Sequence, residues 1–169
     1  MTESEEKLAR VRGLLDAHGL DAIALGRVAN FAWLADGATS YVNTAATFGA
    51  ASLVVTRDAR YMITNNIEAP RFAAEEPVEG LGFRPLIGPW HAANREADAL
   101  LAGKAVGSDG GYPGSVDLTA EIAALRTPRT PTEIARFQAL GKSCAAAMNA
   151  AIRQVRPGLT EMEIAGLIA

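Results

Sequence analysis

Helical patterns and short apolar runs alternate along residues 1–125, and this alternation limits the chain to a small set of folds. Residues 5–18 place apolar side chains at helical spacing, with acidic residues in the first turn and Gly19 just past the end. Residues 20–25 follow as a mostly apolar run, which is typical of a buried strand. A helix, a tight turn and a buried strand indicate a layered α/β fold.

The following segments continue this alternation. Two runs rich in β-branched and aromatic residues, 51–56 and 60–64, flank a short turn and predict a β-hairpin. The remaining expected elements are a helix at 67–75, a strand at 80–87, a helix at 90–102, a strand at 104–108 and a helix at 116–125. We therefore predict an α/β fold in which helices flank a mixed β-sheet, followed by a C-terminal helical extension.

The last third of the chain carries two helix-start signals of the same kind. Thr130, Pro131 and Glu133 form a capping box with proline at the first helical position, and Thr160 and Glu163 repeat the box. Behind the first box, apolar and small side chains recur at helical spacing, which predicts a buried stripe along a long helix. The stripe comprises Ile134, Phe137, Gly141, Cys144, Met148, Ala151 and Val155. Its cysteine, the only one in the chain, is predicted to be a small core residue rather than a nucleophile.

The order of these features resembles the start of the catalytic domain in the pita-bread metallopeptidases, the family of prolidase, Xaa-Pro aminopeptidase and creatinase. The matching residues are Arg126, Thr127-Pro128, Thr132-Glu133-Ile134, Arg156-Pro157-Gly158-Leu159-Thr160-Glu161 and Glu163-Ile164-Ala165. The alternative interpretation is an unrelated pair of capped amphipathic helices, because capping boxes are common.

A second segment resembles the N-terminal signature of the same family. Asn30 precedes the aromatic–leucine pair Trp33-Leu34, which leads to Gly37. The segment departs from the signature at Ala35-Asp36, where a threonine is usual before the glycine.

The resemblance implies a domain organisation and a chemistry. Residues 1–126 would form a creatinase/prolidase-like N-terminal domain, and residues 127–169 would be the two opening helices of a truncated catalytic domain. The family holds two divalent metals, such as manganese, cobalt or zinc, with two aspartates, a histidine and two glutamates. The resemblance implies that these ligands lie beyond Ala169. His18 and His91 have no carboxylates or second histidine at ligand spacing and are expected at the surface. We therefore expect no metal and no hydrolysis in this chain alone, within a parent that is a metal-dependent aminopeptidase or dipeptidase.

Three residues are candidates for shaping a substrate site. The resemblance implies that the loop carrying Tyr41 and Asn43, together with Trp33, reaches the active-site mouth of a partner subunit and helps to select a peptide substrate. In the other interpretation, Trp33 fills the core and the Tyr41 region is an ordered loop. The sequence leaves both open.

Composition restricts the partners. The net charge is −3, and the 16 lysines and arginines are scattered, which disfavours nucleic acids and anionic membranes. Neither a signal peptide nor a membrane span is evident, so a cytoplasmic location is expected. Unpartnered apolar residues in the second helix, Ile164, Leu167 and Ile168, predict a homo-oligomer, most simply a dimer. The alternative function is a stand-alone, non-catalytic dimerisation or partner-binding module. A phosphate-binding role for the glycine-rich loop 107–114 is disfavoured, because it lacks a P-loop lysine.

Overall fold

The computed structural model describes residues 2–76, 78–92 and 94–168. The chain divides into two compact units, Met1–Pro128 and Arg129–Ala169.

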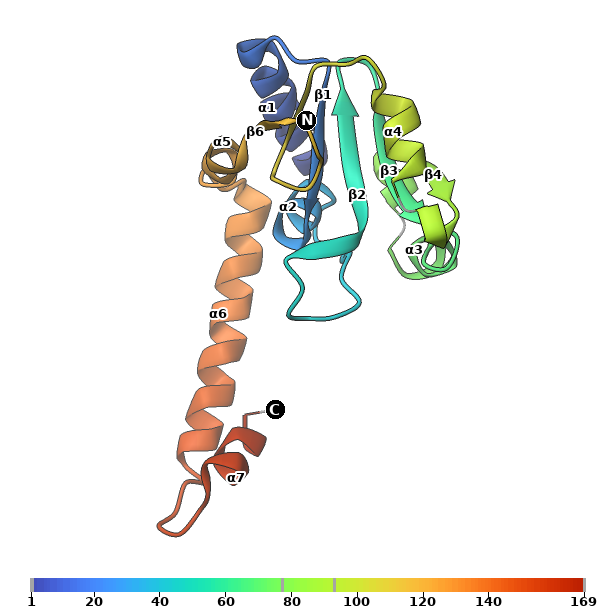
Figure 1. The fold of residues 1–169 in the computed structure, drawn as a ribbon. Coiled ribbons are helices and arrows are strands. Elements are labelled where there is room, and N and C mark those ends of the chain that lie inside the picture. The colour runs from blue at the N-terminus through green and yellow to red at the C-terminus, as the bar shows by residue number, and fades with distance from the viewer. Residues whose placement is uncertain (1, 77, 93, 169) are drawn as a thin grey trace. The chain divides into compact units, whose positions relative to one another are not determined.

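A six-stranded mixed sheet forms the centre of the first unit, with the spatial order β4-β3-β2-β1-β5-β6 (Figure 1). The strands are β1 (Ala22–Arg27), β2 (Phe48–Thr56), β3 (Arg60–Asn65), β4 (Arg84–Gly88), β5 (Val106–Ser108) and β6 (Val116–Asp117). Strand β2 runs antiparallel to both of its neighbours, whereas β1, β3, β4, β5 and β6 share one direction. The carboxyl ends of these five strands therefore lie along one edge of the sheet.

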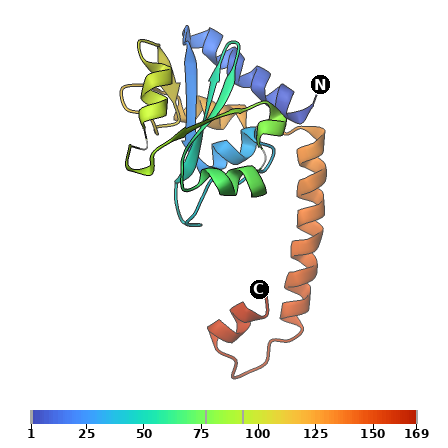
Figure 2. The ribbon, with the colours of Figure 1, turned by 90° about the vertical axis from the view of Figure 1, so that its right-hand side faces the viewer.

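Helices cover the two faces of the sheet unequally (Figure 2). The larger core lies on one face, under α1 (Glu3–His18), α2 (Val28–Leu34), α3 (Ala69–Glu75) and α5 (Thr119–Leu125). The opposite face carries a smaller cluster beneath α4 (Arg95–Leu101). Short 3₁₀ turns, Val78–Leu81 and Trp90–Ala92, complete the described helical elements of this unit. The predicted mixed sheet flanked by helices is confirmed.

Alternation along the strands sets the size of each core, because successive side chains point to opposite faces. In β1, Ile23 and Leu25 enter the larger core, while Ala22 and Ala24 face α4. The side facing α4 is thus lined by much smaller side chains, and one helix of seven residues covers it.

Turn and capping signals in the sequence locate the β2–β3 hairpin and the ends of α1. The predicted hairpin is confirmed as β2 and β3, which pair in register from Ala51 with Thr64 to Val55 with Arg60. Helix α1 begins two residues earlier than expected, because Thr2 and Glu5 form a capping box, and it ends at Gly19 in the left-handed region, with φ 63°.

Other expectations were wrong in detail. The strand expected at 80–87 is confined to Arg84–Gly88 and follows a 3₁₀ turn, and the helix expected at 90–102 is a 3₁₀ turn followed by α4. Val116–Asp117 pairs with β5 as a strand, so α5 starts only at Thr119, where the Asp117 carboxylate accepts from the backbone N–H at 2.9 Å.

The second unit contains α6 (Pro131–Ile152) and α7 (Glu161–Gly166), and both predicted capping boxes are present. The predicted burial of the α6 stripe is wrong for most of its length. Phe137 is 58% exposed, Met148 is 48% exposed and Cys144 is exposed, whereas Ala151 is buried. The reason is that no described element of this unit covers that face of α6. No described helix is long and apolar enough to cross a membrane.

Candidate functional site at the carboxyl edge of the sheet

The carboxyl edge of the five parallel strands carries a fully buried carboxylate. Asp109 follows β5 directly and is fully buried. Its Oδ1 accepts from the Gly26 N–H at 3.0 Å, and its Oδ2 accepts from the Arg27 N–H at 2.9 Å and from Asn30 Nδ2 at 2.8 Å. A buried carboxylate is tolerated here because three donors surround it. Asp109 therefore joins the ends of β1 and β5 to the start of α2.

Two arginines extend this network. Arg27 donates from Nε to the Asp109 carbonyl oxygen at 2.7 Å, and its guanidinium lies 5.3 Å from the centre of the Phe48 ring. Arg126 donates from Nη1 to Asn30 Oδ1 at 2.9 Å. Asn30 is thus held on both sides of its carboxamide. This network fixes the orientation of α2 and of the chain that leaves it.

A loop of residues 35–47 leaves α2 and carries two of the predicted site residues. Tyr41 is half-buried and Asn43 is exposed. Asn43 Oδ1 accepts from the Ala45 N–H at 2.9 Å, which closes a local turn. Ser40 anchors the loop beside β2, because its carbonyl oxygen accepts from the Ala50 N–H at 2.6 Å. The loop that carries Tyr41 and Asn43 is therefore attached to β2 by a backbone hydrogen bond at Ser40.

Trp33 lies in a different setting from the other two candidates. It is 7% exposed and belongs to the larger core, as the core interpretation predicts. The Lys7 ammonium lies 5.9 Å from its ring centre, and Lys7 also pairs with Glu3 and Asp36. Trp33 is buried in the core whereas Asn43 is exposed, and the predicted role of Trp33, Tyr41 and Asn43 in substrate selection stays a prediction.

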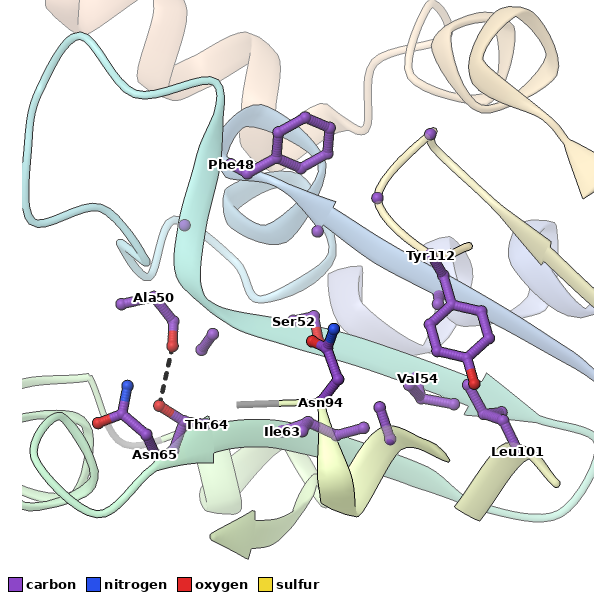
Figure 3. A pocket seen from close by; sticks show the side chains of 17 residues that line it. Phe48, Ala50, Ser52, Val54, Ile63, Thr64, Asn65, Asn94, Leu101 and Tyr112 are labelled. Atoms are coloured by element: carbon purple, nitrogen blue, oxygen red, sulfur yellow. Dashed lines mark hydrogen bonds between the residues drawn. The ribbon is translucent and has the colours of Figure 1, made fainter. Parts of the chain in front are cut away.

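A cavity of about 330 Å³ opens at the same edge, on the α4 face of the sheet (Figure 3). Its floor is the small-residue side of β1 and β2, where Ala24, Gly26, Ala50 and Ser52 stand in place of large side chains. In Figure 3, Thr64 and Asn65 lie at one end of the cavity, and Val54, Leu101 and Tyr112 lie at the other. None of the three predicted site residues lines it.

Tyr112, which lines the cavity, has a shifted pKa. Burial, and then the hydrogen bond from its hydroxyl to the Asp98 carboxylate at 3.1 Å, raises the pKa of Tyr112 above its ordinary value of 10.0. Tyr112 therefore presents a neutral hydroxyl.

Metal ligands do not cluster in the described part of the chain. No group of three or more histidine, cysteine, aspartate or glutamate side chains is placed to hold an ion there. His18 and His91 are both exposed, as predicted. The described residues therefore do not fit the two-metal centre that the sequence resemblance implies for a longer parent.

The sequence matches no family model, and no curated protein matches it at a significant level. Solved structures do match. An Xaa-Pro dipeptidase from Bacillus anthracis has a TM-score of 0.70 at 18% identity, covering 98% of this chain and 47% of its own. A prolidase from Pyrococcus horikoshii OT3 has a TM-score of 0.71 at 17% identity, covering 96% of this chain and 47% of its own.

The chain shares the fold of these prolidase-type peptidases. A dipeptidase PepE from Mycobacterium ulcerans matches in the same way, with a TM-score of 0.68 at 20% identity over 99% of this chain and 48% of its own. The chain thus spans about half the length of the structures that it matches. These structures are prolidases and related dipeptidases, the family that the sequence resemblance indicates.

Sequence reasoning missed Asp109 and the cavity. The sequence places Asp109 in the glycine-rich loop 107–114, and its position directly after a buried strand is the signal that points to it. The cavity also had a signal in the sequence: alanine, glycine and serine recur at every second position in 22–26 and 50–52.

Proposed function

We propose that this chain is the N-terminal, non-catalytic part of a metal-dependent aminopeptidase or dipeptidase of the Xaa-Pro type. The observation that supports this most strongly is the shared fold, which covers 96–99% of this chain but about half of each matching peptidase. In this proposal the chain supports dimerisation and shapes the substrate site, while residues beyond Ala169 supply the ligands for two divalent metals such as manganese, cobalt or zinc. Its working location is the cytoplasm, and its parent's substrate is a peptide.

The loop 35–47 is the part of the chain that would act on substrate choice. Its base is fixed at Ser40 and its exposed tip presents Asn43 beside Tyr41. A loop of this kind, held by a rigid sheet, is where binding groups are commonly placed. We assign Tyr41 and Asn43 to the mouth of a partner subunit's active site, and Trp33 to the support of α2 beneath them.

A stand-alone binding module is the second candidate, and the exposed apolar stripe of α6 favours it. A module of this kind would use that stripe to hold a partner instead of a catalytic domain. The reading frame after codon 169 separates the two candidates. Continuation into a segment with two aspartates, a histidine and two glutamates supports the peptidase, and a stop codon supports the module.

A further inference from the structure

We propose that the cavity beside α4 is a binding site for an uncharged small molecule that has a flat apolar body and a primary amide or similar hydrogen-bonding group. Its volume, about 330 Å³, lies at the lower end of the range for small-molecule pockets. A ligand of one or two rings fits that size.

The position of the cavity is the first reason. It lies at the carboxyl ends of three strands that share one direction. Gly26 is the second-last residue of β1, Asn65 is the last residue of β3, and the loop 110–112 follows β5. Ligands of open α/β sheets bind at this carboxyl edge, because the loops that leave parallel strands diverge there and leave a crevice.

The charge of the lining is the second reason. The cavity is lined by Ala24, Gly26, Phe48, Gly49, Ala50, Ala51, Ser52, Val54, Ile63, Thr64, Asn65, Asn94, Ala97, Leu101, Gly110, Gly111 and Tyr112. None of these side chains carries a charge at neutral pH. The charged groups bound to the lining already have neutral partners in the chain: three donors hold the Asp109 carboxylate, Arg27 binds the Asp109 carbonyl oxygen and the Phe48 ring, and the Asp98 carboxylate accepts from the Tyr112 hydroxyl. A charged ligand would lose its hydration without gaining a counter-ion, so an uncharged ligand is favoured.

Unpartnered polar groups in the lining are the third reason. Ser52 Oγ makes no hydrogen bond within the described residues, and neither does the Asn94 carboxamide, which does not cap α4. Asn65 uses its Oδ1 for the N–H groups of Ile67 and Glu68, which leaves its amide donors available. A hydroxyl and two carboxamides offer both donors and acceptors, which is the complement of a primary amide.

The apolar end of the cavity suits a ring. Val54, Ile63, Ala97 and Leu101 form its wall, and the Tyr112 ring closes that end in Figure 3. Small floor residues on β1 and β2 leave room for a flat body to lie along the strands, because their side chains reach little beyond the backbone.

Three probes of nearly the same shape test the charge requirement. Benzamide is uncharged, benzoate is an anion and benzamidine is a cation at neutral pH. Each is titrated into the ¹⁵N-labelled chain, and backbone and side-chain amide shifts are followed. We expect benzamide to bind with a Kd on the order of 1 mM, as suits a ligand of its size, and to shift Gly26, Ser52, Asn94 and Gly111. Benzoate and benzamidine should bind at least about tenfold more weakly.

Variants locate the binding. Ser52→Leu fills the floor of the cavity and should abolish the benzamide shifts, whereas Ala120→Leu, at an exposed position of α5, should leave them unchanged. Ala50→Val also narrows the cavity, from another position of β2. Because valine is favoured in strands, this variant tests the site if Ser52→Leu fails to fold.

Any one of the following results would overturn the proposal. They are an absence of saturable benzamide shifts, equal affinity for the three probes, shifts centred outside the cavity, and unchanged binding in a folded Ser52→Leu or Ala50→Val variant. Shifts of the same amides on raising the protein concentration without a probe would also overturn it, since a second copy of the chain would then occupy the cavity.

Discussion

Arg126 donates a hydrogen bond from Nη1 to Oδ1 of Asn30 at 2.9 Å and so joins the end of α5 to α2. These two residues belong to the two separate segments that resemble prolidase-type peptidases in sequence. Asn30 in turn donates to the buried Asp109. The backbone on both sides of Arg126 is also held, because Arg10 Nη1 donates to the carbonyl oxygens of Leu125 and Pro128 at 3.2 and 2.7 Å. The first unit therefore ends on a fixed segment.

Replacing Asn30 tests this network. Asn30→Ala removes one donor from the Asp109 carboxylate and the acceptor of Arg126, so the free energy of unfolding should fall by about 1–3 kcal/mol. Urea denaturation followed by circular dichroism measures the change. Asn94→Ala is the matched control, because Asn94 is exposed and its side chain makes no hydrogen bond to a described residue, and its effect should stay within about 0.5 kcal/mol. Equal effects of the two substitutions would contradict the structural role of Asn30.

Elements with local signals could be predicted from the sequence. Each capping box, at Thr130 and at Thr160, spans only four residues. The hairpin of β2 and β3 joins two clear strand patterns through a short turn. Each such signal fixes its own backbone, so a single sequence contains enough information to locate it.

Features that depend on distant residues could not be predicted. Asn30 and Asp109 are separated by 79 positions, and nothing in their local sequence shows that they meet. Helix α2 has seven residues and no side-chain cap at Arg27, and β6 has two residues, so neither carries a readable period. The α6 stripe has the period of a buried face, but a period does not say whether a covering element is present.

Acid should weaken the start of α1. The backbone N–H of Thr2, and then its hydroxyl, lower the pKa of Glu5 below its ordinary value of 4.5. Because the folded pKa is the lower one, the stabilisation is present above pH 4.5 and is lost as the pH falls through the lowered value. The ¹³C shift of the Glu5 carboxyl group reports this titration, and the Thr2 amide signal should move with it. A Glu5 midpoint at or above 4.5 would contradict the capping box.

The exposed stripe of α6 should drive self-association. Ile134, Phe137 and Met148 lie on one side of the helix and are 46%, 58% and 48% exposed, and a surface of this kind favours contact with another apolar surface. Light scattering at micromolar concentration should give a mass above that of one chain. Phe137→Lys combined with Met148→Lys should restore the monomer, whereas Ala146→Lys, on the opposite side of α6, should not. A wild-type chain that is monomeric throughout this range would contradict the prediction.

The loop 35–47 should influence catalysis in the full-length parent. Tyr41→Ala or Asn43→Ala should lower kcat/KM for an Xaa-Pro dipeptide about tenfold, equivalent to about 1.4 kcal/mol of transition-state stabilisation, with little loss of stability. Val42→Ala is the control, since Val42 stands between the two candidates and its side chain is 70% exposed. Unchanged kinetics for both variants would leave Tyr41 and Asn43 as ordinary loop residues.

Hydrolysis of an Xaa-Pro dipeptide, compared between residues 1–169 and the product of the full reading frame, tests the proposed function most directly. A two-metal hydrolase needs carboxylates and histidine that converge on a shared water, and the described residues contain no such cluster. With manganese, cobalt or zinc supplied, we expect chelator-sensitive turnover from the full-length product and none from residues 1–169. Turnover by residues 1–169, or its absence from a folded, metal-loaded full-length product, would contradict the proposed function.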